Sequence, residues 1–441
     1  MERRRKNLTQ LFIPICLETL LYMLSGMVDT LMLSSVNDQA VGAVGTANTY
    51  IGIFIIMFSV ISSGMVAVMT QNIGAGRPGV AYQARQLGLA FNAVLGIILS
   101  LILAFGAGTI LAGVGVADAL MQPARTYLQI VGGFCILNAL IPICSSYLRA
   151  FGFSKEPLYA SIIGNVINFC LNAFFLFVLH KGVAGVATAT VISRIINLVI
   201  VVMLGAVLVK AKQHPERESN REVMGQIIRI GLPSACETAI YNVSMTLVIR
   251  FLNQMDAQGL NVTARSYTMQ ITNFSYCVGA ALAQANAIMT GWRIGAKEYD
   301  ACDRGTRKAA IIGVIVAVIL ETMFALCSGW IMQLFSKDPQ MVSLVGKLLA
   351  IDIVLEMGRV TNLVYGQALK TSGDAVFPVV MGACFMILCS VGGTYLFGIR
   401  LGLLAVGAYI GMAGDECVRA VGMYLRWKSG KWKEKGLVKS R

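Results

Sequence analysis

Residues 14–25 read PICLETLLYMLS and residues 233–244 read PSACETAIYNVS, so one pattern occurs twice at a separation of 219 positions. Proline, glutamate, threonine, tyrosine and serine coincide in the two copies. Each copy lies in a long apolar segment, where a carboxylate is costly to bury, and this cost argues against a chance recurrence. Duplicated halves with ionisable groups at membrane depth are typical of secondary transporters.

The repeat continues beyond its first segment. Residues 73–75 (IGA) return at 294–296, and Gly152 and Pro157 return as Gly373 and Pro378. Glycine and proline often mark loops by themselves. An ordered series at an offset that changes only from 219 to 221 indicates a duplication of the whole first half.

The composition predicts a membrane protein that crosses the bilayer many times. Hydrophobic residues make up 56% of the chain and charged residues 13%, and the mean hydropathy is +0.71. Apolar runs of about 20 residues can each cross the hydrocarbon core as a helix. Twelve such spans are expected, at 11–36, 48–72, 86–112, 126–149, 157–179, 183–209, 228–252, 266–290, 308–335, 340–368, 376–398 and 403–426.

The net charge of +14 is explained by membrane topology. If residue 1 is cytoplasmic, 26 lysines and arginines fall on the inner side, seven on the outer side and three within spans. Positive charge on the inside predicts that both termini are cytoplasmic and that basic loops contact anionic lipids. Nucleic acid is therefore not an expected partner.

We expect an all-α fold of two six-helix lobes. An even number of spans returns the chain to its starting side, so the halves should be related by a pseudo-two-fold axis along the membrane normal. The expected parts are an N-lobe at 1–209, a cytoplasmic linker at 210–229, a C-lobe at 230–426 and a basic cytoplasmic tail at 427–441.

The first span carries a polar stripe. Glu18, Tyr22, Ser25 and Asp29 share one face of a helix by their spacing. The second copy repeats Glu and Tyr as Glu237 and Tyr241 but has Val248 in place of Asp29, so the lobes are chemically unequal. An intramembrane acid predicts a functional site, and the alternative is a structural ion pair.

Polar residues in spans 5 and 6 could complete such a site. Asn165, Asn168 and Asn172 lie on one helical face, and Thr188 and Thr190 lie near the start of span 6. Amide and hydroxyl oxygens beside a carboxylate can share a proton or hold a hard cation. The alternative is hydrogen bonding between packed helices.

The second half contains further intramembrane charges. Asp352, Glu356 and Arg359 follow one face of span 10, and Glu356 can pair with Arg359. Asp415 and Arg419 also have ion-pair spacing. The chain contains no HExxH, GxSxG or CxxC pattern, so an enzyme, a metal centre or an organic cofactor is not expected.

The order of these motifs resembles the multidrug and toxic compound extrusion (MATE) family, within the multidrug, oligosaccharidyl-lipid and polysaccharide exporter superfamily. The resemblance covers nearly the whole chain. Its carriers are Pro14, Val28-Asp29-Thr30, residues 71–76 (QNIGAG), Asn168, Asn172, residues 185–188 (GVAT), Gly231-Leu232-Pro233, residues 294–296, and the run from Glu356 through Arg359 and Asn362 to Gly373-Asp374 and Pro378.

The resemblance implies a monomeric exporter of organic, cationic and aromatic compounds in the bacterial inner (plasma) membrane, which works by H⁺ or Na⁺ antiport and rocker-switch alternation. By motif match, Asp29, Asn168, Asn172 and Thr188 form its cation site, with Na⁺ possible at Asp29. Some members carry an acid where Arg359 stands, so the resemblance does not extend to a C-lobe cation site of their kind.

Substrate contacts are expected at Glu18, Tyr22, Glu237, Tyr241 and Glu356. The alternative function is a flippase for lipid-linked oligosaccharides in the same superfamily, which needs a cationic cavity for pyrophosphate.

Overall fold

The computed structural model describes residues 6–35, 38–113, 116, 118–210, 214–256, 258–333 and 335–438. Within these ranges the chain is helical nearly throughout and contains no strand. Helices satisfy their own backbone hydrogen bonds, which a segment surrounded by lipid requires. Residues 1–5 of the expected N-lobe, 211–213 of the expected linker and 439–441 of the expected tail lie outside the described residues.

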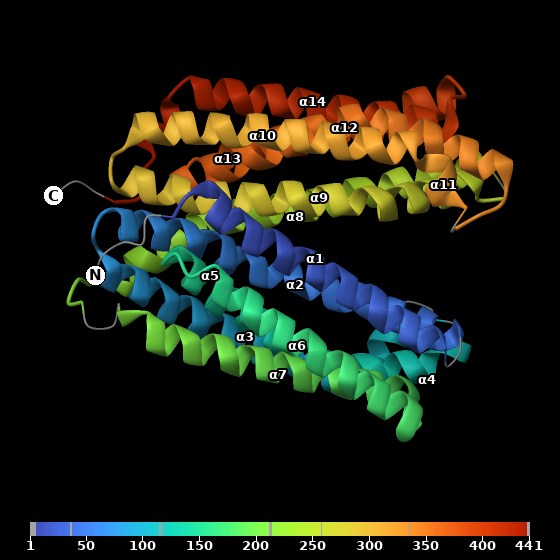
Figure 1. The fold of residues 1–441 in the computed structure, drawn as a ribbon, viewed down its shortest axis with the longest axis horizontal. Helices are drawn as coiled ribbons and strands as arrows, with labels where there is room; N and C mark the ends of the chain where they lie inside the picture. Colours follow the sequence, from blue (N-terminus) through green and yellow to red (C-terminus); the bar gives the residue numbers. More distant parts are fainter. Residues whose placement is uncertain are drawn as a thin grey trace. The chain divides into compact units, whose positions relative to one another are not determined.

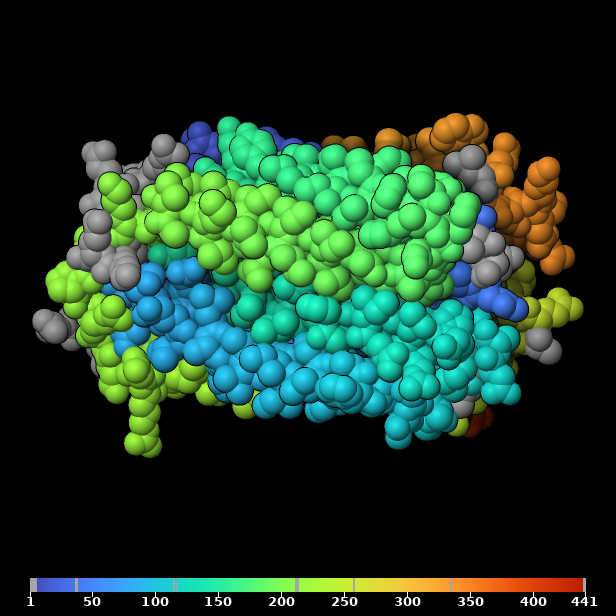
Figure 2. Space-filling model, turned by 90° about the horizontal axis from the view of Figure 1, so that it is seen from below, coloured from blue at the N-terminus to red at the C-terminus, as the bar shows by residue number. Residues whose placement is uncertain are grey.

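The chain divides into two compact units, Met1–Gly231 and Leu232–Arg441, which we call the N-lobe and the C-lobe. In the N-lobe, α4 with the π-helical turn η1 meets α5 at a bend of 43°. The helices α6 and α7 lie side by side on one face of this lobe (Figure 2). Its elements are α1 (Leu8–Ser34), α2 (Asp38–Gly74), α3 (Pro78–Gly113), α4 (Asp118–Tyr127), η1 (Leu128–Gly132), α5 (Ile136–Ala150), α6 (Lys155–Ala173), η2 (Phe174–Val178) and α7 (Gly182–Leu208).

The C-lobe is organised around α12, which packs against α9, α10 and α14 (Figure 1). Helix α8 (Asn220–Met255) begins in the N-lobe and continues into the C-lobe. The other elements are α9 (Leu260–Gly295), α10 (Tyr299–Leu326), α11 (Ser328–Met332), α12 (Pro339–Ser372), α13 (Val376–Phe385), the π-helical segments η4 (Met386–Val391) and η5 (Thr394–Arg400), α14 (Leu404–Lys428) and the 3₁₀ turn η6 (Lys431–Glu434).

Each of the twelve expected spans overlaps a helix or an interrupted helix. By length and apolar composition alone, seven helices of the described residues could cross a membrane, or eight if the bent pair counts as one span. The helices that fail this test are α8, α9, α12 and α14, and all four contribute to the C-lobe. They fail because their sequences are more polar, and part of that polarity is buried within the lobe, as at Asp352, Glu356 and Asp415.

Apolar side chains cover the outside of both lobes. Phe105 of α3 is 84% exposed and Leu326 of α10 is 81% exposed. Exposed apolar surface on this scale is costly in water and suits contact with lipid. The protein is therefore a multi-pass membrane protein.

The duplication is visible in the backbone. Gly152 and Gly373 end equivalent helices with left-handed φ angles of 86° and 100°, a conformation that glycine adopts without steric cost. The π-helical segments η2 and η5 also occupy equivalent positions at an offset of about 220 residues. Irregular helices of this kind occur often near functional sites.

The residues after α14 fold back onto the C-lobe. Trp432 is 1% exposed, and its ring stacks on Trp427 with centroids 4.2 Å apart and an interplanar angle of 8°. The Trp427 indole N–H donates to Asp303 of α10 at 2.9 Å. Part of the segment expected as a basic tail is thus anchored by buried aromatic contacts.

The described part of the segment expected as a linker is attached to the N-lobe. Glu218 forms a 2.6 Å ion pair with Arg77, before α3. The Gln83 side chain of α3 donates to the Glu218 carbonyl at 2.7 Å and accepts from its N–H at 3.0 Å. These contacts fix the chain just before α8 begins.

Candidate functional site

The expected cation site has its centre between α1 and α6. Asn172 Nδ2 donates a 2.6 Å hydrogen bond to Asp29 Oδ1. Asp29 is half-buried and Asn172 is fully buried. The acid therefore faces a neighbouring helix of its own lobe, and an uncharged amide holds its carboxylate.

A chain of polar groups extends from this contact into α7. Asn172 Nδ2 also donates to Asn168 Oδ1 at 3.1 Å, and Asn168 Nδ2 donates to Ser193 Oγ at 3.5 Å. Asn172 Oδ1 is buried and has no hydrogen-bond partner among the described residues. An unpartnered amide oxygen beside a carboxylate is a suitable ligand for a hard cation or a proton donor.

The Thr188 hydroxyl donates to the Ala184 carbonyl of its own helix at 2.8 Å, and its place in the cation site stays a prediction. Ser193, which the motif match did not include, is the α7 hydroxyl that joins the amide chain. Ser193 lies three residues after Thr190, which places the two side chains on one face of α7.

Arg194 and Tyr127 surround the carboxylate without bonding it. Both groups interact with Asp29 electrostatically, but no described residue forms an ion pair with Asp29. A carboxylate held by neutral groups keeps the ability to gain a proton or a cation, whereas one bonded to a guanidinium does not. The described residues contain no cluster of three His, Cys, Asp or Glu side chains able to hold a metal ion.

The repeated glutamates form equivalent ion pairs. Glu18 of α1 pairs with Arg149 of α5 at 2.5 Å, and Glu237 of α8 pairs with Lys370 of α12 at 2.6 Å. Arg149 and Lys370 are themselves 221 positions apart. The duplication therefore preserves a partly buried salt bridge, and sequence reasoning identified only its acidic half.

The two repeated tyrosines differ in surroundings. Tyr22 is 67% exposed on the N-lobe. Tyr241 lines a cavity of about 410 Å³ inside the C-lobe, together with Glu237. A cavity of this volume is in the range that binds drug-sized compounds.

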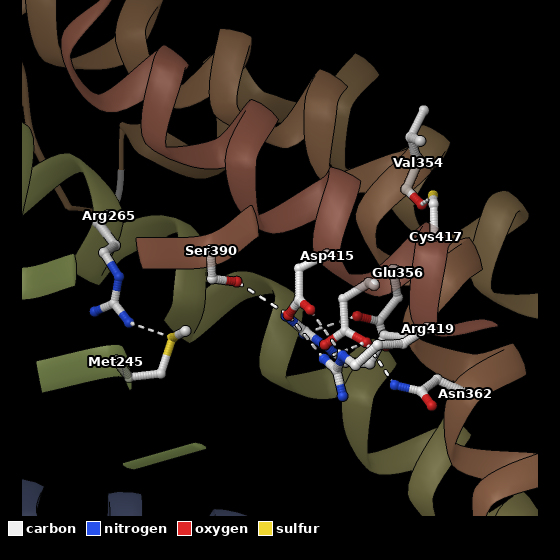
Figure 3. Close-up of polar contacts among 11 residues, drawn as sticks. Met245, Arg265, Val354, Glu356, Asn362, Ser390, Asp415, Cys417 and Arg419 are labelled. Atoms are coloured by element: carbon white, nitrogen blue, oxygen red, sulfur yellow. Dashed lines mark hydrogen bonds and ion pairs between the residues drawn. The ribbon is translucent and has the colours of Figure 1, made fainter. Parts of the chain in front are cut away.

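An ion-pair network borders this cavity (Figure 3). Arg359 bonds Glu356 at 2.8 Å and lies 3.5 Å from Glu416. Arg419 bonds Asp415 and Glu416, each at 2.9 Å. The expected pairs Glu356–Arg359 and Asp415–Arg419 are both confirmed, and Glu416 joins them into one network.

Two neutral donors and one glycine support the network. Asn362 donates to Glu416 at 3.1 Å, and Ser390 donates to Asp415 at 3.0 Å. Gly358 lets α12 approach α14 closely, because a Cβ at this position would lie 2.9 Å from the Cys417 nitrogen. The close helix contact brings Arg359 within reach of α14 acids.

Two further acids near the network form no ion pair with a described base. Glu321 of α10 is fully buried, and neither of its carboxylate oxygens has a hydrogen-bond partner among the described residues. Asp352 of α12 is 2% exposed and forms no ion pair with a described residue. Isolated charges in such surroundings are costly, so these groups are stable as neutral acids or beside a bound cation.

Arg265, just before expected span 8, is one of the seven basic residues that the expected topology places on the outer side. In the structure it is 7% exposed and lines the C-lobe cavity. Its position in the sequence, five residues after the start of α9, does not indicate that the side chain is buried. A long arginine side chain can reach well past its own Cα, and sequence reasoning does not predict its direction.

Comparison with known proteins agrees with this architecture. The profile of the MatE family matches residues 14–174 and 233–396, which are the two halves of the duplication. The uncharacterized transporter YisQ of Bacillus subtilis is 34% identical, over 96% of this chain and 94% of that protein. The probable multidrug resistance protein NorM of Thermotoga maritima is 24% identical, over 98% of this chain and 94% of that protein.

Solved structures give the same fold. A MATE crystal structure in the bent conformation aligns with a TM-score of 0.88 and 18% identity, covering 97% of this chain and 96% of the other. An outward-facing multidrug resistance MATE transporter of the MOP superfamily aligns with a TM-score of 0.86, covering 98% and 96%. The expected all-α fold of two lobes is confirmed. Because the profile matches both halves, the chain belongs to the MatE family and is a membrane transporter, not an enzyme.

Proposed function

We propose that the protein is a secondary active multidrug efflux transporter. It exports organic compounds in exchange for H⁺ or Na⁺ and alternates between two orientations by a rocker-switch motion. Relatives named as probable multidrug resistance proteins support this assignment. The observation that carries it is the hydrogen bond between Asp29 and Asn172 inside the N-lobe.

Asp29 is the coupling acid in this proposal. When it gains a proton or Na⁺, a half-buried charge disappears from the interface of α1 and α6. Asn168 and Asn172 supply the amide oxygens of the site, with Ser193 as its α7 hydroxyl and Thr188 nearby on α7. A bound cation shifts the equilibrium of the two orientations only if it binds one of them more tightly, and the change in the Asp29 contacts provides that difference.

The substrate region of the proposal includes the C-lobe cavity. Tyr241 contributes an aromatic wall, and cationic aromatic compounds can stack on such a ring. Glu18, Glu237 and Glu356 each pair with a base, so a cationic substrate would have to share these acids with Arg149, Lys370 or Arg359. Tyr22 is exposed on the N-lobe and remains a proposed contact.

A lipid-linked sugar flippase is less well supported. It requires a cavity with free positive charge for pyrophosphate. Three of the four bases that line the C-lobe cavity are paired with acids.

We place the exporter in the bacterial inner membrane as a monomer, with both termini cytoplasmic and basic loops against anionic lipid.

Reconstitution into liposomes tests the proposal. A fluorescent organic cation is followed under an imposed pH gradient and then under a sodium gradient. Asp29→Asn should abolish gradient-driven export while the protein stays folded. Asp118→Asn, which changes an exposed acid of the same lobe, is the matched control and should transport normally. Export by Asp29→Asn at the normal rate would refute the assignment.

A further inference from the structure

The C-lobe cavity is lined by one cation that no described acid neutralises. Arg265 of α9 is 7% exposed and forms no ion pair with any described carboxylate. Its Nη2 lies 3.9 Å from the Met245 sulfur, and its Nε has no hydrogen-bond partner among the described residues (Figure 3). The buried guanidinium of Arg265 contacts a thioether, which is a weak acceptor, so N–H groups of this side chain remain available to donate hydrogen bonds.

The other bases that line the cavity are already satisfied. Lys370 pairs with Glu237 at 2.6 Å. Arg359 and Arg419 belong to the ion-pair network, in which three acids face two guanidinium groups. An additional anion gains little from these bases because the network already contains an excess of acid. Arg265 is therefore the position at which an incoming anion would be bound.

Asp352 is the acidic counterpart of Arg265. It lines the same cavity, is 2% exposed, and its Oδ2 has no hydrogen-bond partner among the described residues. Tyr409 lines the same cavity as both charged side chains. Burying either charge without a partner costs several kcal/mol. A ligand that carries both charges would remove both penalties at once.

Part of the remaining cavity wall is flexible and apolar. Met245, Met269, Met386 and Met412 line it, together with the aromatic ring of Tyr276. Flexible thioethers adapt to ligands of different shapes. The volume of about 410 Å³ accepts an aromatic body with short polar substituents.

We propose that the C-lobe cavity binds amphoteric organic compounds. The ligand carboxylate bonds Arg265, the ligand ammonium faces Asp352, and the apolar body lies against the methionines. Arg265 thereby determines specificity for carboxylate-bearing compounds. The physiological meaning of this site rests on the proposed export function, whereas binding itself is measured without transport.

A matched pair of fluorescent probes tests the proposal. At about pH 6, where an α-amino group is protonated, Nε-dansyl-lysine carries an ammonium and a free carboxylate, and its methyl ester carries the ammonium alone. Each is titrated against the purified protein in lipid nanodiscs, without any ion gradient. A charge-assisted hydrogen bond in a buried site predicts that the free acid binds about tenfold more tightly than the ester.

Variants assign the preference to the residues. In Arg265→Gln the preference for the free acid should disappear, with the affinity for the ester unchanged within about twofold. Asp352→Asn should weaken both probes alike, since both carry the ammonium. Arg250→Gln removes an exposed arginine of α8 outside the cavity and should behave as the wild type.

The outcomes separate this proposal from the proposed function. Equal affinity of the two probes for the wild type overturns the proposal, even if Arg265→Gln does not fold. A preference that survives in folded Arg265→Gln overturns it as well. Asp29→Asn should keep the preference. If that variant transports normally, the coupling assignment fails while the carboxylate site stands.

Discussion

The two lobes derive from one duplicated unit but hold buried charge in opposite ways. The N-lobe site has a single carboxylate, Asp29, whose bonded partner is the neutral amide of Asn172. In the C-lobe, Arg359 and Arg419 bond Glu356, Asp415 and Glu416, so two guanidinium groups are shared by three carboxylates. In the proposed function, the first lobe changes its charge when a cation binds, whereas the arginines of the second lobe hold ion pairs beside a cavity.

The largest expected effect concerns this framework. Arg419→Gln leaves Asp415 and Glu416 buried without their base, so the folded state should lose about 3–5 kcal/mol. The loss is measured by thermal unfolding in detergent, with Arg400→Gln, an exposed arginine, as the control. An unchanged melting temperature would contradict the view that the network holds α12 and α14 together.

The next effect concerns the N-lobe. Asn172→Ala removes the donor to Asp29 and the amide oxygen beside it, so cation-driven export should fall about tenfold or more, which corresponds to one buried hydrogen bond to a charged group. Initial export rates in liposomes measure the change. Asn165→Ala, on the same helix and without a contact to Asp29, should keep most of the activity. Equal losses in the two variants would argue against a specific site.

The duplicated salt bridges allow a direct comparison of the lobes. Double-mutant cycles of Glu18→Gln with Arg149→Gln, and of Glu237→Gln with Lys370→Gln, should each give a coupling energy of about 1 kcal/mol, because all four side chains are only partly exposed. Unfolding of the single and double variants supplies the values. A coupling energy near zero in one lobe alone would mean that the pair has lost its structural role there.

The smallest effect is expected at Glu321. Neither carboxylate oxygen of Glu321 has a hydrogen-bond partner among the described residues, so ionising this side chain is already costly. Glu321→Gln replaces it with a neutral amide. Stability and export should therefore stay at the wild-type level, in contrast with Asp29→Asn. The same unfolding and transport assays apply to both variants. Loss of export in Glu321→Gln would assign a coupling role to the C-lobe as well.

Much of this arrangement could be predicted from local sequence patterns. Helical spacing placed Asp29 on a polar face and predicted the pairs Glu356–Arg359 and Asp415–Arg419, which lie within one helix. The order of motifs along the spans predicted the two-lobe fold. The contact of Asp29 with Asn172 joins residues 143 positions apart. Spacing offered Asn172 as one of several polar residues that could complete the site, and the resemblance to a family singled it out.

The spacing of residues along the sequence could not predict the contacts between helices. The Glu18–Arg149 pair joins positions 131 residues apart, and Arg149 was counted simply as a cytoplasmic charge. Arg265 was counted as an outer charge for a similar reason, because hydropathy locates a helix end but not the direction of a long side chain. Thr188 bonds its own backbone, a choice that composition does not predict.

The stacked indoles of Trp427 and Trp432 provide an optical reporter within the natural chain. The protein contains four tryptophans, so replacing Trp292 and Trp330 with phenylalanine would leave emission from this pair alone. At a centroid separation of 4.2 Å the rings should exchange excitation energy, and any separation of the segment after α14 from the helix end would change the emission. Spectroscopy without an attached dye could thus follow the C-lobe through a transport cycle.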